Sequence, residues 1–450
     1  MKYKHLLLIM LFFPALAVHG QVTQFGVHAD QNSILRCCEL PDGRVLDLIL
    51  VQEDPATSCF VLHLDGDTTA QRFYLLTSWT VRDVRIWDGR YAYFCGIQTD
   101  PFTNDEKGLV GMFDIMAFLG GTGVVNYYYF DWVNYGFIIA KDLKRLDLFE
   151  ITGGVGMAMV GDAIFNKANH ENTTTVAYAD FDGTTWRTCT FMRKPTSLKF
   201  TDIVCLKDLI VAVGTDTLGA GCYTKTFYRG SCFPSMPCTG SQYQQLVYGS
   251  PVGNVLAAQT QDDTAVLAHY DNTAGGSTVL HKVSFSYLTG LFDTPVDTWE
   301  SAPAAPAYGS GWQLRELTAN GNHVHLLHYT AYPGASVTTD SWWVMGGTLP
   351  YTSAPITANL WYPTYNRVQS LDKDPLLNKP RISVNNLDLL TYGIASWNEG
   401  PCCIVGSVTL NHGTGFKDLL LMDCYSWSDD PANFVFIPVL TTISATEICR

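Results

Sequence analysis

Short stretches of alternating apolar and polar residues, joined by tight turns, recur along the chain. The stretch 81–96, VRDVRIWDGRYAYFCG, alternates on both sides of Asp88-Gly89 and ends in Gly96. Asp-Gly between alternating segments is among the strongest short-range signals for a β-hairpin. We therefore predict two antiparallel strands here, joined at Asp88-Gly89.

The same plan returns at several other places. After most copies come two further strand-like runs, such as LVGMFDI at 109–115 and VNYYYFDW at 125–132. Units of four strands are therefore predicted to start near residues 33, 81, 143, 200, 252, 313 and 385. The clearest further copies are LKRLDLFEITGGVGMAMVG (143–161), FTDIVCLKDLIVAVG (200–214), QLRELTANGNHVHLLHYT (313–330) and VNNLDLLTYGIASWNEGPCCIVG (384–406).

A four-stranded meander repeated seven times is the signature of a β-propeller. We predict an all-β chain, a β-propeller with seven blades of four-stranded antiparallel sheets. The first hairpin of each blade is then scaffold, with its apolar residues packed between neighbouring blades. Asp83 and Asp202 hold equivalent places in two copies. We expect them to bind backbone amides or turns, because a recurring residue serves the repeat.

A ring of blades leaves an edge strand unless the two ends of the chain meet in one sheet. We expect the segment after Leu40, or FVFIPVL at 434–440, to complete a sheet begun at the other terminus. Cys449 lies beside the C-terminus, and Cys37-Cys38 lies near the N-terminus. A disulfide between these two places is our hypothesis for locking the ring.

Residues 1–20 are typical of a secretory signal peptide. Lys2 and Lys4 precede a short apolar run, and small residues suit a cleavage site before Gln21. We predict a signal peptide over 1–20 and a single β-propeller domain over 21–450; the alternative is a buried N-terminal strand. No later run reaches transmembrane length. We expect an exported protein without an integral membrane segment, located in the periplasm, at the cell surface or outside the cell.

The charge balance changes the list of partners. Without Lys2 and Lys4, the 28 basic residues become 26, against 42 acidic ones, a net charge of −16. An acidic chain repels polyanions, which argues against nucleic acid and anionic membrane surfaces as partners.

The thirteen cysteines give a mixed signal, because the number is odd. Cys95 and Cys205 sit inside apolar strand-like runs, so we expect buried thiols there. Cys232 and Cys238 flank the turn-rich FPSMP and are our candidate for a local disulfide. No C-x-x-C pair is present, which excludes the usual zinc-ribbon and thioredoxin motifs.

The chain resembles secreted β-propeller proteins of the Bacteroidetes type, many of which have no known activity. The resemblance rests on the leader ending in Gly-Gln and on the repeated hairpin pattern of 81–96. It implies the architecture and identifies no catalytic residue. FDGTTW at 181–186 approaches the sialidase-type Asp box but lacks its serine and its D-x-G spacing.

Motifs for catalysis or metal binding are weak. His323 and His325 would share one face of a strand, but no third ligand is evident beside them. We therefore expect neither metal nor cofactor. Acidic pairs occur at 262–263, 372 and 374, and 429–430, in contexts typical of solvated turns.

Aromatic residues gather in NYYYFDW, SWW, LWYPTY and CYSW. Exposed rings stack on sugar faces or anchor a protein partner, whereas buried rings fill the space between blades. Trp342 and Trp343 are adjacent, so one of them would face outward in a strand. Trp361 and Tyr362 lie beside a proline, on a predicted connecting loop. We take Trp342, Trp343, Trp361 and Tyr362 as candidate ligand-binding residues.

Two hypotheses about function follow. The first is an exported, non-catalytic protein that recognises a glycan or a protein on one rim of the propeller. The second is an extracellular polysaccharide hydrolase or lyase with loop carboxylates in the central channel, which rests on fold analogy alone. A structural role in a surface assembly is a third. Aromatic candidates without a catalytic motif favour the binding protein.

Overall fold

The computed structural model describes most strands of the chain and their nearest turns. The described residues are 22–28, 34–54, 57–64, 70–130, 138–165, 171–191, 198–216, 222–228, 242–246, 251–259, 264–271, 277–286, 289, 291, 297–300, 312–320, 323–331, 340–348, 366–368, 387–396, 402–410 and 417–424.

The described residues form seven four-stranded antiparallel sheets. Three of them contain β2 (Ile34–Glu39), β3 (Val45–Asp54), β4 (Thr57–Leu64) and β5 (Ala70–Tyr74); β6 (Trp79–Trp87), β7 (Tyr91–Thr99), β8 (Glu106–Asp114) and β9 (Val125–Tyr129); and β10 (Ile138–Ile151), β11 (Gly154–Phe165), β12 (Glu171–Phe181) and β13 (Trp186–Phe191).

The next three sheets repeat this order of consecutive strands. They contain β14 (Leu198–Cys205), β15 (Leu209–Asp216), β16 (Cys222–Tyr228) and β17 (Gln242–Leu246); β18 (Pro251–Gln259), β19 (Ala265–Asp271), β20 (Ser277–Val283) and β21 (Asp297–Glu300); and β22 (Trp312–Asn320), β23 (His323–Ala331), β24 (Asp340–Thr348) and β25 (Asn366–Val368). Each predicted unit start lies within five residues of the first strand of a sheet.

The last sheet joins the two ends of the described chain. It contains β26 (Leu387–Ser396), β27 (Cys402–Leu410) and β28 (Lys417–Cys424), and its outer strand is β1 (Val22–His28). Val22 pairs with Met422, antiparallel to β28. A sheet shared between the ends was predicted, but the segment after Leu40 was the wrong choice, because that segment is β3 and pairs within its own sheet. The run 434–440 lies outside the described residues.

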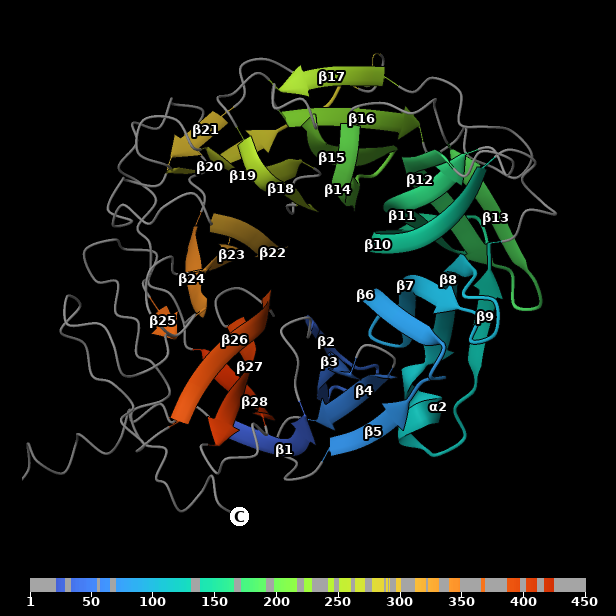
Figure 1. The fold of residues 1–450 in the computed structure, drawn as a ribbon, viewed down its shortest axis with the longest axis vertical. Coiled ribbons are helices and arrows are strands. Elements are labelled where there is room, and N and C mark those ends of the chain that lie inside the picture. The colour runs from blue at the N-terminus through green and yellow to red at the C-terminus, as the bar shows by residue number, and fades with distance from the viewer. Residues whose placement is uncertain are drawn as a thin grey trace, which may run out of the picture.

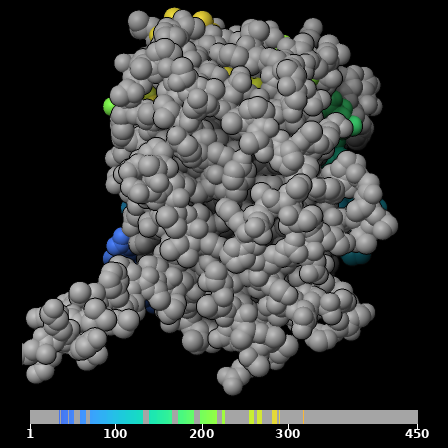
Figure 2. All heavy atoms as spheres, turned by 90° about the vertical axis from the view of Figure 1, so that its left-hand side faces the viewer, coloured from blue at the N-terminus to red at the C-terminus, as the bar shows by residue number. Residues whose placement is uncertain are grey.

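The sheets stand around a ring in the arrangement of a β-propeller (Figure 1). In six sheets the strand that comes first in the chain lies nearest the centre and the fourth lies at the outside. In the last sheet β26 lies nearest the centre and β1 lies at the outside. The first strands of consecutive sheets contact one another around the whole ring, including β26 with β2. Figure 2 turns the left side of Figure 1 toward the viewer, so the sheets from β6 to β13 lie on its far side.

The apolar cores lie between neighbouring sheets, as the sequence predicted. One core joins Phe60 of β4 to Phe94 of β7 and Phe113 of β8, with ring centroids 5.7 and 5.2 Å from Phe60. The next joins Cys95 to residues of the β10–β13 sheet, among them Leu143 and Met159. Because each core needs side chains from two sheets, no single sheet buries its own apolar face.

The glycine that ends three of the copies, at Gly96, Gly161 and Gly214, is required by close packing against the neighbouring strand. A β-bulge interrupts β6 between Val81 and Asp83, and Gly96 of β7 lies opposite Val81. A Cβ atom on Gly96 would collide with the backbone oxygen of Thr80. Gly161 and Gly214 meet the same obstacle opposite the bulges of β10 and β14. Only glycine therefore fits opposite these bulges.

Buried aspartates tie consecutive sheets together. Asp83 Oδ2 accepts a hydrogen bond of 3.0 Å from the amide of Leu146 on β10. Asp202 Oδ2 accepts one of 2.9 Å from the amide of Ala257 on β18. The predicted backbone-binding role of Asp83 and Asp202 is confirmed.

A third aspartate, Asp147, forms the same kind of hydrogen bond between the β10–β13 sheet and the β14–β17 sheet. Asp147 Oδ2 accepts a hydrogen bond of 2.7 Å from the amide of Cys205 on β14. Carboxylates of β6, β10 and β14 thus each bind a backbone amide of the following sheet, which fixes the spacing of four successive sheets.

The described residues include one short helix that the sequence did not predict. Helix α2 (Ile115–Leu119) joins β8 to β9, with Asp114 as its N-cap residue. Its five residues are too few to give a periodic apolar pattern. No helix in the described part of the chain is long and apolar enough to cross a membrane.

Candidate functional site

A pocket of about 810 Å³ opens between the β6–β9 sheet and the β10–β13 sheet. Its walls come from the turn between β6 and β7, helix α2, the turn between β10 and β11 and the turn between β12 and β13. Because the strands of each sheet are antiparallel and consecutive, these connections all lie at the same rim. The pocket is therefore a feature of one rim of the ring.

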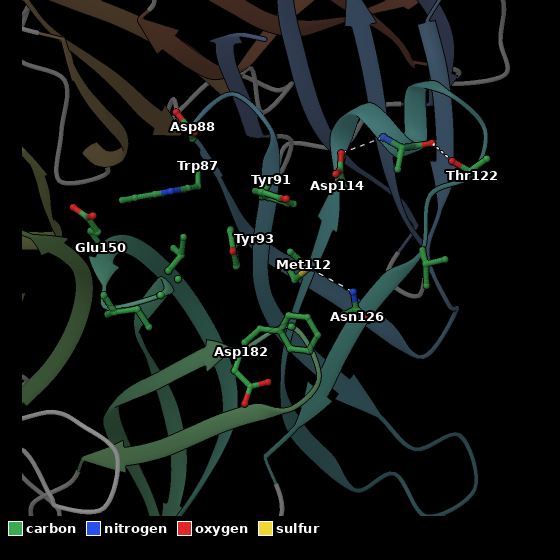
Figure 3. Close-up of a pocket in the computed structure, with 18 residues that line it drawn as sticks. Trp87, Asp88, Tyr91, Tyr93, Met112, Asp114, Thr122, Asn126, Glu150 and Asp182 are labelled. Atoms are coloured by element: carbon green, nitrogen blue, oxygen red, sulfur yellow. Dashed lines mark hydrogen bonds between the residues drawn. The ribbon is translucent and has the colours of Figure 1, made fainter. Parts of the chain in front are cut away.

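Two cross-strand rows of side chains form one wall of the pocket (Figure 3). Trp87, Tyr91 and Asp114 are direct neighbours across β6, β7 and β8. Tyr93, Met112 and Asn126 form the next row, across β7, β8 and β9. Side chains two residues apart on a strand share a face, so both rows point the same way.

The opposite wall belongs to the β10–β13 sheet. Glu150 and Val155 are paired across the β10–β11 hairpin, and Phe181 with Asp182 leads into the turn before β13. Figure 3 shows Glu150 and Asp182 across the pocket from Trp87, Tyr91 and Tyr93. Aromatic rings and carboxylates therefore face a shared hollow.

The tip of the β6–β7 hairpin has the geometry that its sequence predicts. Asp88 has φ 51° and Gly89 has φ 59°. Positive φ at both central residues defines a type I′ turn, which Asp-Gly favours. The turn places Asp88 on the rim at the pocket, with an exposed side chain.

Two of the pocket carboxylates are already occupied by protein donors. Asp114 pairs with Arg90 at 3.0 Å and accepts a hydrogen bond of 3.1 Å from the amide of Ala117. Asp182 accepts hydrogen bonds from the amides and hydroxyls of Thr184 and Thr185. These bonds hold the pKa of Asp182 well below its usual value, so this carboxylate stays ionised.

Tyr93 is the most enclosed polar group of the pocket. It is 5% exposed, and its hydroxyl has no hydrogen-bond partner among the described residues. Burial raises its pKa to about 12, and the neighbouring Tyr91 adds to the shift. The phenol therefore stays protonated at neutral pH and can donate a hydrogen bond into the hollow.

The predicted aromatic residues lie elsewhere. Trp342 and Trp343 are on β24, where they pair with Val368 and Arg367 of β25. Trp361 and Tyr362 lie outside the described residues, as do Cys232 and Cys238. These predictions stay predictions.

The histidines of NHVHLLH also lie away from the pocket. His323, His325 and His328 are all on β23. Among the described residues, no group of three or more histidine, cysteine or acidic side chains is placed to hold a metal ion.

Five of the described cysteines, Cys38, Cys59, Cys95, Cys189 and Cys205, form no disulfide. Cys95 and Cys205 are buried and form no disulfide, as predicted. Burial, with the nearby charge of Asp83, raises the pKa of the Cys95 thiol and makes it unreactive. Cys38 is also a free thiol, so it does not form the disulfide that was our hypothesis for locking the ring. Cys449 lies outside the described residues, and the pairing with Cys37 stays a prediction.

Sequence reasoning treated 81–96 as scaffold and did not select its aromatic residues. The structure confirms the scaffold, and it adds that Trp87, Tyr91 and Tyr93 line the pocket at the rim end of the hairpin. The available signal was their position, because Trp87 and Tyr91 flank the turn and Tyr93 shares a face with Tyr91. FDGTTW also lies here, with Phe181 and Asp182 in the opposite wall.

Comparisons with known proteins add little beyond these observations. No family model and no curated protein matches the chain. A protein of unknown function from Dyadobacter fermentans is 11% identical, with TM-score 0.39, over 90% of this chain and 99% of its own. An exo-1,5-alpha-L-arabinanase from a bovine ruminal metagenomic library is 9% identical, with TM-score 0.30, over 66% and 97%.

The acylaminoacyl peptidase of Pyrococcus horikoshii has a higher TM-score of 0.43, at 10% identity. The alignment covers 94% of this chain but only 55% of the peptidase, so the chain spans about half of that protein. Likenesses this distant carry no argument about activity.

Proposed function

We propose that this chain is an exported, non-catalytic binding protein that recognises a glycan or a protein on one rim of a seven-bladed propeller. The proposal includes a signal peptide over 1–20 and a mature domain over 21–450. The observation that carries it is the rim pocket, where the side chains of Trp87 and Tyr91 line the same hollow as four carboxylates.

The chemistry of the pocket suits binding. Aromatic faces stack on the apolar faces of sugars or cover a partner's side chain, and carboxylates accept hydrogen bonds from hydroxyl and amine groups. Asp114 and Asp182 are held by protein donors, so they shape the pocket and its charge.

The first test is binding of purified 21–450 to a broad glycan array, with Trp87→Ala as the site variant. Phe102→Ala is the matched control, because Phe102 is 93% exposed on the β7–β8 connection at the opposite rim. We expect any specific signal to fall in Trp87→Ala and to persist in Phe102→Ala. A signal that both variants retain would overturn the pocket as the binding site.

The sequence candidates form a second proposed group of ligand-binding residues, Trp342, Trp343, Trp361 and Tyr362. Trp343→Ala and Trp361→Ala belong on the same array. If the array signal is lost only in these variants, the binding site includes the sequence candidates and lies outside the pocket. The proposed Cys232–Cys238 disulfide is tested separately, by peptide mass mapping with and without reduction.

The alternative is an extracellular polysaccharide hydrolase or lyase. Four pocket carboxylates, Asp88, Asp114, Glu150 and Asp182, keep this reading open, because glycoside hydrolysis needs two carboxyl groups across the scissile bond. Incubating the protein with each bound glycan and measuring new reducing ends tests it. Cleavage that disappears in Asp88→Asn or Glu150→Gln would favour the enzyme.

A further inference from the structure

We infer that the rim pocket binds an organic ammonium group, held against the ring of Trp87 and beside the carboxylate of Asp88. This inference rests on the proposed binding function and names the chemistry of the ligand. It follows from three features of the cavity, namely its charge, its aromatic wall and the unpartnered hydroxyl of an enclosed tyrosine.

The charge of the lining has one sign. The lining residues include four acids, Asp88, Asp114, Glu150 and Asp182, and no lysine or arginine. Arg90 neutralises Asp114 from outside the lining, since it contacts that carboxylate at 3.0 Å. The remaining charge is negative, and Asp182 keeps its charge because its turn lowers its pKa. A cavity of this kind concentrates cations and disfavours anions.

The aromatic wall favours an organic cation over a bare metal ion. Ring faces attract ammonium groups within about 6 Å through the electron density of their faces, and tryptophan does so best. Arg90 already makes such a contact with Tyr91, because its guanidinium lies 5.0 Å from the centroid of that ring, so the ring left for a ligand is that of Trp87. Trp87 is half-buried, so part of its surface stays open to a ligand.

The hydroxyl of Tyr93 is the second, independent observation that points to a ligand. The side chain of Tyr93 is 5% exposed and lines the pocket, and its hydroxyl lacks a hydrogen-bond partner among the described residues. A ligand that carries a hydroxyl or carbonyl oxygen beside its ammonium group would accept a hydrogen bond from this hydroxyl.

Asp88 is held in place without using its carboxylate. The type I′ turn fixes its backbone, and no described residue donates a hydrogen bond or an ion pair to its side chain. The carboxylate therefore does not have to break a protein contact before it meets a cation.

Choline is the probe for this chemistry, and 3,3-dimethylbutan-1-ol is its uncharged counterpart of the same shape. Each is titrated into purified 21–450 by isothermal calorimetry and by NMR of the tryptophan indole signals. We expect choline to bind saturably and the neutral alcohol to bind at least about tenfold more weakly, the effect of one desolvated cation–aromatic contact. Raising the salt concentration should weaken choline binding.

The variants test the placement of the cation. Trp87→Ala should weaken choline binding about tenfold, and Asp88→Asn about threefold or more. Asparagine also accepts positive φ, so Asp88→Asn keeps the turn. Phe102→Ala and Asp105→Asn are matched controls on the opposite rim and should leave the affinity unchanged.

Three results would overturn the inference. They are equal affinity for choline and its neutral counterpart, choline binding that survives both pocket variants, and no choline binding at about 10 mM. A neutral glycan that binds the array and is lost in Trp87→Ala, without choline binding, would overturn the ammonium inference and leave the binding function standing. No binding of choline and no array signal would remove both the inference and the glycan version of the function.

Discussion

Asp83 and Asp88 lie five residues apart on one hairpin, yet their carboxylates have opposite surroundings. Asp83 is fully buried and accepts hydrogen bonds from the amides of Val84 and Leu146 and from Arg36. Asp88 is exposed at the turn, without a partner among the described residues. The comparison shows how to distinguish the two roles. A carboxylate whose oxygens accept hydrogen bonds from the protein is structural, and one without protein donors is available to a ligand.

The same contrast holds between sheets. The hydrogen bond from an aspartate to a backbone amide of the next sheet recurs at Asp83, Asp147 and Asp202. The rim turns differ, since Asp88-Gly89 of one sheet is followed by Thr152-Gly153 in the next. Residues that repeat maintain the ring, and residues that change from sheet to sheet are free to form a site.

The largest expected effect on the free energy of unfolding comes from removing an aspartate that joins two sheets. Asp83→Ala leaves the amide of Leu146 and the guanidinium of Arg36 without their buried acceptor. We expect it to lower the free energy of unfolding by about 3–5 kcal/mol, the cost of breaking a buried charged pair. Guanidinium unfolding measures this, with Asp88→Asn as the control.

Asp88→Asn should change the free energy of unfolding by no more than about 0.5 kcal/mol, as exposed substitutions usually do. Equal losses in Asp83→Ala and Asp88→Asn would show that the ties between sheets do not support the ring.

The glycine opposite each bulge gives the second largest effect. Gly96→Ala places a methyl group against the backbone oxygen of Thr80, which cannot move without disturbing the bulge. We expect a loss of about 2–3 kcal/mol, comparable to overpacking a core. Gly154→Ala is the matched control, because its nearest neighbour, the oxygen of Phe181, would lie 3.7 Å away. If the two variants unfold at the same denaturant concentration, the steric account of the repeat is wrong.

The repeated hairpins made the fold predictable. Alternation around Asp88-Gly89 indicated β6 and β7, and the same pattern located the first strand of every sheet within five residues. The roles of Asp83 and Asp202 followed from their recurrence. The strand β1, by contrast, has a short sequence with an internal glycine, VTQFGVH, and its pairing with β28 depends on a contact across almost the whole chain.

The site was much less predictable than the fold. The alternation that places core residues also runs through Trp87, Tyr91 and Tyr93. The pattern therefore does not distinguish an aromatic side chain buried between sheets from one that lines a pocket at the rim. That difference depends on the facing sheet, where Glu150 and Asp182 lie about 60 and 90 residues further along the chain. No local signal connects residues so far apart in the sequence.

The pKa of Asp147 is raised, which adds a pH dependence to the comparison. Burial raises its pKa to about 6, against the opposing effects of the amides of Cys205 and Leu148 and the charge of Arg36. The folded state therefore binds more protons than the unfolded state between about pH 4 and pH 6, and the stability from this carboxyl is lost as the pH rises through that window.

Asp147→Asn removes this titration. We expect its free energy of unfolding, relative to the unmodified protein, to rise by up to about 2 kcal/mol between pH 4 and pH 7. Urea unfolding at several pH values measures the difference. Parallel pH profiles for the two proteins would mean that the tie from Asp147 to Cys205 carries no pH dependence.

The smallest expected effect separates a hydroxyl held by the scaffold from one left for a ligand. Tyr129 accepts a hydrogen bond of 2.7 Å from the indole nitrogen of buried Trp79, so Tyr129→Phe should cost about 1–2 kcal/mol. Tyr93→Phe removes a hydroxyl without a partner among the described residues and should cost less than about 0.5 kcal/mol. Urea midpoints compare the two variants directly. A larger loss in Tyr93→Phe would place the Tyr93 hydroxyl in the scaffold and take it away from the pocket's binding chemistry.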